Sequence, residues 1–301
     1  MNTTAKLSAY GVTLALVAIG ALALGNAVGP LESNTTSGAE GAGHGDTHSG
    51  TVTENAMAGE PAGLASSRGG YTLTPTSTTL IPGTTNSFSF HITGPDHHPV
   101  TKFDVEHEKR MHLIVVRRDT AGFQHIHPTM SADGTWTVPL TLDQAGSYRA
   151  FADFTPTGGE GTTLGVDLAA AGDFQPTTYA PSTVATVDGY EVRLSGDLVP
   201  GELSKVTLTV TKDGRPVTDL QPYLGAYGHL VALRGGDLAY LHVHPDGEPG
   251  DGRTRPGPTV TFYAEVPSAG NYRLFLDFRH GDTVRTAEFT VRTAEFTVEG
   301  S

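Results

Sequence analysis

The 301-residue sequence contains no cysteine, which excludes disulfide bonds, thiolate metal ligands, cysteine nucleophiles and lipid-modified cysteines. It has only four methionines, which argues against a thioether-rich cage for Cu(I). Its 19 Lys and Arg are outnumbered by 32 Asp and Glu, and the formal net charge of −13 opposes binding to nucleic acid or to an anionic membrane surface. G-x-S-x-G, H-E-x-x-H and phosphate-loop motifs are missing as well. We therefore predict a protein that is not an enzyme and whose natural partners are cations.

The N-terminus carries an apolar stretch at residues 9–28, which is preceded by the basic residue Lys6. The small residues Ala23 and Gly25 fit a signal-peptidase site, while the length of the stretch is near the minimum for a membrane span. Residues 1–30 are therefore predicted to be a signal peptide or an N-terminal membrane anchor. Either one places the rest of the chain outside the cytoplasm, secreted or attached to the cytoplasmic membrane through this segment alone. Residues 31–70 are rich in Gly, Ser, Thr and Ala and are predicted to form a disordered linker.

The rest of the chain contains an internal repeat of two copies. Three histidines and a proline recur 117 residues later, and the block at residues 145–154 recurs at residues 269–278 with an aspartate at the same place. The second copy carries seven extra residues between the two blocks, inside a Gly/Pro-rich run that is typical of a loop. We predict two copies of one domain, at residues 71–178 and 183–299. The repeated residues are His112, His125, His127, Pro128 and Asp153, matched by His229, His242, His244, Pro245 and Asp277.

The pattern of residues in both copies is typical of β-strands joined by turns. Short runs of Val, Ile, Thr, Phe and Tyr are broken by Pro-Gly, Asp-Gly and Ala-Gly, and helical periodicity is missing. We predict an all-β fold of two tandem immunoglobulin-like β-sandwich domains, after an N-terminal hydrophobic helix and the disordered linker. The closing sequence RTAEFTV at residues 285–291 is repeated at once, and only one copy is expected in the last strand. The expected strands are 71–74, 86–93, 111–117, 122–127, 135–142, 146–154 and 163–168 in the first copy, and 190–195, 204–212, 228–234, 237–244, 259–266, 270–278 and 283–291 in the second.

The spacing of the histidines predicts that they converge. In each H-x-H pair both imidazoles project from the same face of a strand. A tight turn before the pair makes a hairpin, and if His112 lies opposite His127, then residue 114 pairs with His125 and all three histidines share one face. In the second copy, the same register gathers His229, His242 and His244. Asp153 and Asp277 sit between apolar neighbours and are expected either to ligate a metal or to accept the remaining N–H of a ligand imidazole.

Three neutral imidazoles with an oxygen ligand suit Cu(II), and Zn(II) is the alternative. A third interpretation needs no cofactor, because buried histidines can simply donate hydrogen bonds to Asp153 and Asp277. The first copy also has His97, His98 and the run at residues 106–108, Glu-His-Glu, which the second copy lacks. We interpret these as a charged loop on a solvated edge rather than as a second site.

Met-His-Leu-Ile-Val at residues 111–115 with His-Ile-His-Pro at 125–128, and Gly-His-Leu-Val at 228–231 with His-Val-His-Pro at 242–245, resemble a family of poorly characterised bacterial exported proteins. That family pairs an M-H-L-I-V strand with an H-x-H-P strand, often in duplicate, and is suspected of heavy-metal, chiefly copper, handling. The resemblance spans residues 71–291 and favours a metal ion as the ligand. Another exported metal-handling protein is a further expected partner. The predicted function is therefore sequestration or delivery of copper, or less strongly zinc, outside the cytoplasm. The alternative is a metal-free cell-surface structural or adhesion module.

Overall fold

The computed structural model describes residues 61–293. Every described residue belongs to one compact unit. The predicted signal or anchor segment, most of the predicted linker and most of the second RTAEFTV copy lie outside the described residues. Between residues 61 and 293, the structure contains no helix of the length and apolarity that a membrane crossing needs.

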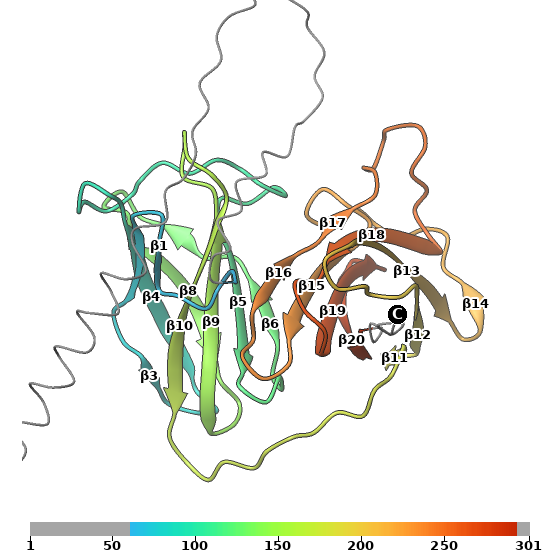
Figure 1. The fold of residues 1–301 in the computed structure, drawn as a ribbon, viewed down its shortest axis with the longest axis horizontal. Helices are drawn as coiled ribbons and strands as arrows, with labels where there is room; N and C mark the ends of the chain where they lie inside the picture. Colours follow the sequence, from blue (N-terminus) through green and yellow to red (C-terminus); the bar gives the residue numbers. More distant parts are fainter. Residues whose placement is uncertain (1–60, 294–301) are drawn as a thin grey trace, which may run out of the picture. The chain divides into compact units, whose positions relative to one another are not determined.

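The first repeat is a β-sandwich of two sheets (Figure 1). One sheet has the order β1-β2-β4-β8-β7 and the other β3-β10-β9-β5-β6, and all neighbours are antiparallel except β3 and β10. The strands are β1 (Ser67–Arg68), β2 (Tyr71–Pro75), β3 (Thr79–Leu80), β4 (Thr85–Thr93), β5 (His112–Arg117), β6 (Gln124–Ile126), β7 (Thr129–Met130), β8 (Trp136–Thr141), β9 (Gly146–Phe154) and β10 (Thr162–Ala170).

The second repeat repeats this architecture. One sheet has the order β11-β12-β13-β18-β17 with β14 paired to β13, and the other has the order β16-β15-β19-β20. The fold is therefore all-β, with two tandem immunoglobulin-like sandwiches, as the sequence predicted. The strands are β11 (Val184–Val187), β12 (Tyr190–Ser195), β13 (Leu203–Lys212), β14 (Arg215–Pro216), β15 (His229–Arg234), β16 (Tyr240–His242), β17 (His244–Pro245), β18 (Thr259–Glu265), β19 (Asn271–His280) and β20 (Thr283–Arg292).

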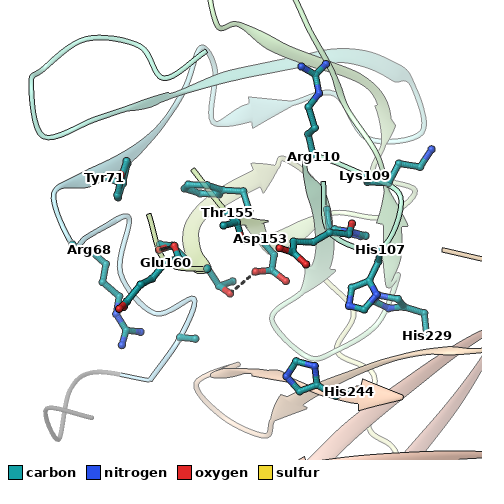
Figure 2. Close-up of a pocket in the computed structure, with 18 residues that line it drawn as sticks. Arg68, Tyr71, His107, Lys109, Arg110, Asp153, Thr155, Glu160, His229 and His244 are labelled. Carbon is teal, nitrogen blue, oxygen red and sulfur yellow. Dashed lines mark hydrogen bonds between the residues drawn. The ribbon is translucent and has the colours of Figure 1, made fainter. Parts of the chain in front are cut away.

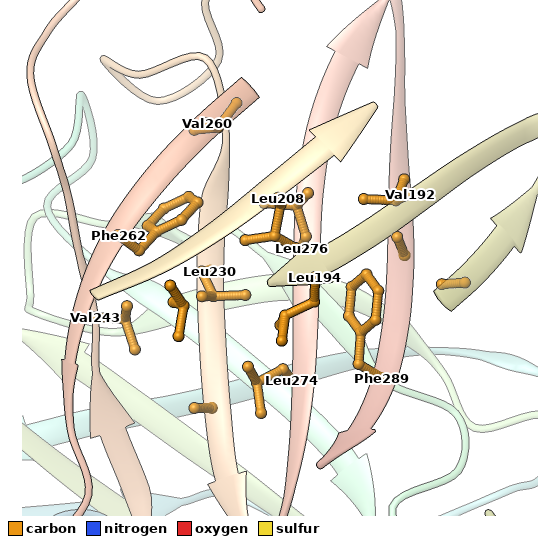
Figure 3. Packing of buried hydrophobic residues seen from close by; sticks show 14 of the residues in the cluster. Val192, Leu194, Leu208, Leu230, Val243, Val260, Phe262, Leu274, Leu276 and Phe289 are labelled. Atoms are coloured by element: carbon orange, nitrogen blue, oxygen red, sulfur yellow. The ribbon is translucent and has the colours of Figure 1, made fainter. Parts of the chain in front are cut away.

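Each sandwich encloses its own hydrophobic core. In β13, buried and more exposed residues alternate, so that Val206, Leu208 and Val210 point into the second core. Phe262 lies beside them on the neighbouring strand β18 of the same sheet, and Phe289 meets them from β20 of the other sheet (Figure 3). This alternation is the period-two pattern that made these strands predictable from the sequence.

A third hydrophobic cluster joins the two repeats. All six residues of β5 are buried, so this strand is covered on both faces. The Phe123 ring stacks on Phe275 with centroids 4.0 Å apart, and Phe151 packs against Tyr240 at 5.6 Å. Phe123 and Tyr240 occupy the same position in their repeats, as do Phe151 and Phe275. The contact is therefore reciprocal: each repeat supplies the same two aromatic positions. The members are Ile114, Val116, Phe151, Val231, Leu233, Leu238, Tyr240 and Phe275, with Ala62 and Phe123 packed against them.

The segment just before the first repeat is part of the same junction. The Ala62 carbonyl accepts a hydrogen bond from the Tyr240 backbone N–H at 2.9 Å, and the Gly63 N–H donates to the Thr163 carbonyl at 3.1 Å. The buried Arg149 guanidinium donates to the Gly63 carbonyl at 2.7 Å. Residues 61–70, which composition assigned to the disordered linker, instead take part in the fold, because their backbone groups find partners on both repeats.

The predicted strands coincide closely with the observed ones. β9 and β12 have the predicted bounds. Residues 237–244 were predicted as one strand, but the chain changes sheets at Val243, so that β16 pairs with β15 and β17 with β18. The first copy of the closing heptad lies in β20. β11 and the two-residue strands β1, β3, β7 and β14 were not predicted from the sequence. A two-residue strand is too short to show the alternation of buried and exposed residues.

Candidate metal centre

The register of the histidine hairpin is the one that the sequence predicted. Ile114 pairs with His125 across β5 and β6, and Leu113 pairs with Ile126. In the second repeat Val231 pairs with His242, which is the matching register. On the other side of β5, His112 pairs with Asp153 of β9, as His229 pairs with Asp277 of β19. The histidines project from the outer face of the sheet, where Ile114 meets the second repeat.

His112, His125 and His127 converge. One ligand nitrogen from each of the three lies within 4.8 Å of the other two. The ring centroids of His112 and His125 are 5.3 Å apart, and those of His125 and His127 are 4.8 Å apart. His112 is 5% exposed, and His125 and His127 are partly buried.

The hydrogen bonds around the triad leave two ring nitrogens facing each other. The Glu106 carbonyl, which can only accept, lies 3.0 Å from His112 Nε2, so this nitrogen carries a proton. Burial lowers the pKa of His112 to about 4, so the ring is neutral near pH 7 and its Nδ1 has a lone pair. The Asp277 carboxylate lies 2.7 Å from His125 Nδ1 and accepts its N–H.

His125 Nε2 then faces that lone pair of His112 Nδ1 at 3.0 Å. Two arrangements satisfy this contact. Either His125 is an imidazolium that donates to His112, or both nitrogens are unprotonated and share a cation. A ligand histidine commonly has its outer N–H fixed by a carboxylate or a backbone carbonyl, as Asp277 and Glu106 do here.

His127 supplies the third nitrogen. Its Nε2 atom is buried, and no hydrogen-bond partner lies within reach among residues 61–293. Burial, with the nearby His125 and His112, lowers the pKa of His127 to about 3, so that it too is neutral near pH 7. A buried polar atom without a partner costs free energy unless something binds it. The three residues therefore fit a metal ion.

The carboxylate that accepts the Nδ1–H of His125 belongs to the second repeat. Asp277 belongs to β19, and the side chains of His125 and Asp277 are 2% and 4% exposed. Its second oxygen accepts the Thr286 hydroxyl at 2.6 Å. The matching Asp153 accepts the Thr163 hydroxyl at 2.9 Å and the Tyr240 hydroxyl at 3.3 Å, and Tyr240 also comes from the other repeat. Of the two roles expected for the aspartates, Asp277 has that of an acceptor for an imidazole N–H.

His229, one member of the second histidine set, lies next to the first set. The His229 ring lies 4.9 Å from His125 and 5.5 Å from His112, centroid to centroid. His244 is exposed, and the side chain of His242 lies outside the described part of the structure. Among the described residues, the first set alone forms a compact ligand group.

His107 is a site residue that the sequence analysis misassigned to a solvated edge. It is half-buried, with its ring 5.2 Å from His229 and 6.2 Å from His112. His107 and Glu108 have φ values of 47° and 64° in a tight turn closed by Glu106 and Lys109. The second repeat has the same turn, with Leu224, 2% exposed, at the position of His107. The large apolar residue at the matching position of the second repeat is the sequence signal that the side chain at this position points inward. His97 and His98 are exposed, as expected.

A pocket of about 880 Å³ lies beside the triad. Residues of both repeats and of the segment before them line it, including His112. Figure 2 shows His107, His229 and His244 gathered at one end, Arg68 and Glu160 at the other, and Asp153 between them.

Comparisons with known proteins identify a family for this chain. No curated protein sequence matches this chain. Similar solved structures include FdeC, an Escherichia coli adhesin, with 19% identity and a TM-score of 0.24, covering 78% of this chain and 66% of FdeC. Invasin, a bacterial integrin-binding protein, has 13% identity and a TM-score of 0.22, covering 73% of this chain and 38% of invasin. The chain thus spans less than two thirds of either protein, and scores this low carry no functional argument.

A tandem chimera of titin Z1Z2 domains has 13% identity and a TM-score of 0.19, covering 74% of this chain and 97% of the chimera. One family model matches the chain twice, at residues 65–172 and 185–295, which together make up more than half of its length. The chain belongs to the family described as a domain of unknown function, DUF8832.

Proposed function

We propose that this protein binds one divalent copper ion through His112, His125 and His127, outside the cytoplasm, and serves in copper sequestration or delivery rather than in catalysis. The observation that carries the proposal is the contact between His112 Nδ1 and His125 Nε2 at 3.0 Å. Their outer nitrogens are held by Glu106 and Asp277, so both inner nitrogens are directed at one point. His127 adds a buried nitrogen that needs a partner.

Imidazole ligands suit both copper and zinc, and a set of three neutral imidazoles without a thiolate suits Cu(II). Zn(II) is the alternative ion.

The extracytoplasmic placement rests on the apolar residues 9–28, followed by the Gly/Ser-rich stretch. In this proposal residues 1–30 export or anchor the chain, and another exported metal-handling protein supplies or receives the ion.

Metal content of the purified chain, measured after equilibration with Cu(II) or Zn(II) and removal of free ion, tests the proposal. We expect about one tightly held Cu(II) per chain, lost in His125→Ala/His127→Ala and kept in the control His97→Ala/His98→Ala. Two ions per chain would mean that His229, His242 and His244 form a site of their own, as the sequence predicted. A folded wild type that retains no metal would leave the metal-free surface or adhesion module as the conclusion.

A further inference from the structure

The pocket beside the triad is far larger than a metal ion requires. Its volume of about 880 Å³ lies in the range of small-molecule sites, roughly 300–1,000 Å³. A hydrated ion with about six waters, at about 30 Å³ each, would occupy only about 180 Å³. The remaining space would hold a small organic molecule together with the ion.

The lining of the pocket carries imidazoles at one end, with the charged Glu106, Lys109 and Arg110 near them, and two opposite charges at the other end. His107, His229 and His244 at one end are metal-binding side chains, and His112 of the triad lines the same cavity. Arg68 and Glu160 at the other end are exposed and carry opposite charges. Asp153 lies between the ends (Figure 2).

An amino acid bound to copper carries groups that both kinds of lining residue can bind. When an α-amino acid chelates Cu(II) through its amine nitrogen and one carboxylate oxygen, the amine keeps two N–H donors and the carboxylate keeps an oxygen that accepts. A guanidinium such as that of Arg68 donates to a carboxylate oxygen, and a carboxylate such as that of Glu160 accepts N–H groups. The imidazole end can meanwhile take up open positions on the copper.

We propose that this pocket receives Cu(II) as its chelate with an α-amino acid and passes the ion to His112, His125 and His127. The inference rests on the proposed function, because it describes how the triad is loaded. In the transfer, copper remains Cu(II), its bonds to the amine and carboxylate break, and bonds to imidazole nitrogens form. The amino acid leaves after its amine takes up one proton from water.

Loading kinetics test this route. Stopped-flow absorbance would follow Cu(II) transfer to the full chain from copper glycinate and, separately, from a copper complex of ethylenediamine, which has no carboxylate. We expect Arg68→Gln to slow loading from glycinate about tenfold and to leave loading from ethylenediamine unchanged. His244→Ala should slow loading from both donors, with the final copper content of both variants unchanged. The control is Arg193→Gln, whose guanidinium is exposed and pairs with Glu191 outside the pocket.

The outcomes separate the two proposals. A wild type that never retains copper removes the proposed function and this inference together. A wild type that retains copper, with both pocket variants loading at the wild-type rate, overturns the pocket route and leaves the triad as the copper site. An equal slowing of Arg68→Gln with both donors would also overturn it, because Arg68 would then not recognise the carboxylate.

Discussion

Replacing Asp277 with Asn should weaken copper binding while leaving the metal-free fold intact. The Asp277 carboxylate accepts both the Nδ1–H of His125 and the hydroxyl of Thr286. An amide has an acceptor oxygen and a donor NH₂ group, so if the oxygen keeps Thr286, the NH₂ group faces His125. Only an unprotonated Nδ1 can accept that donor. The ring proton then moves to Nε2, the nitrogen that faces His112 and that a metal needs.

The expected loss follows from the burial of this pair. Asp277 is 3% exposed, so water does not replace its carboxylate. Loss of the group that orients a ligand histidine typically lowers metal affinity about 10- to 100-fold, which is about 1.4–2.8 kcal/mol. Competition against a chromophoric copper chelator at pH 7 measures this change directly. Circular dichroism of the metal-free variant should match the wild type.

Asp153→Asn is the matched control. Asp153 pairs with His112 across β5 and β9 as Asp277 pairs with His229 across β15 and β19, but it accepts the hydroxyls of Thr163 and Tyr240. We expect it to change copper affinity less than Asp277→Asn does. Copper affinity of Asp277→Asn within twofold of the wild type would refute the reasoning, as would an equal loss in Asp153→Asn.

Three further predictions concern stability, each measured by urea unfolding of the metal-free protein. Unfolded histidines have a pKa near 6.5, whereas burial lowers the pKa of folded His112 to about 4. The free energy of unfolding should therefore fall as the pH drops from 6.5 to 4, by about 3 kcal/mol from His112 alone. A free energy of unfolding that stays constant from pH 7 to 4.5, or the same pH dependence in His112→Gln, would contradict this. Phe275→Ala should lower the free energy of unfolding by about 3–5 kcal/mol. A double-mutant cycle with Phe123→Ala should show a coupling energy of about 0.5–1.5 kcal/mol between the two rings. A coupling energy of zero would mean that the repeats do not pack against each other in solution. Residues 290–298 have the same sequence as residues 283–291. In Phe289→Asp, residues 290–298 can therefore take the place of residues 283–291 in β20 through a seven-residue shift, which puts Phe296 at the buried position and restores part of the lost stability. The rescue lengthens the β19–β20 loop from two to nine residues, at about 1.3 kcal/mol, whereas burying the carboxylate would cost several kcal/mol. Phe289→Asp/Phe296→Asp should therefore be far less stable than Phe289→Asp, and equal stabilities would exclude the shift.

Local patterns made the strands and the hairpin register predictable. The spacing of His125 and His127 with a short turn before them fixes which residue faces Ile114, and no long-range information is needed. The same holds for β13, where period-two alternation shows which side chains enter the core.

The packing of one repeat on the other was not predicted, although its signal is present. The unbroken apolar run Leu113 to Val116 in β5 is typical of a strand buried on both faces, and the second face has to be covered by something. The sequence does not say by what, because the partner of His125 is Asp277, 152 residues away. His107 was missed for a related reason: its turn resembles a solvated loop until Leu224 is seen to be buried at the same place.

The reciprocal aromatic contacts bear on how such a chain can arise. Phe123 on Phe275 and Tyr240 on Phe151 form the contact pattern of a symmetric homodimer, in which one patch meets its own copy. A homodimer of one such domain could make the same contacts, with a carboxylate of one copy beside a histidine of the other. Fusion of two copies makes that pairing independent of concentration. It also frees the halves to diverge, as His107 and Leu224 have done at one inherited position.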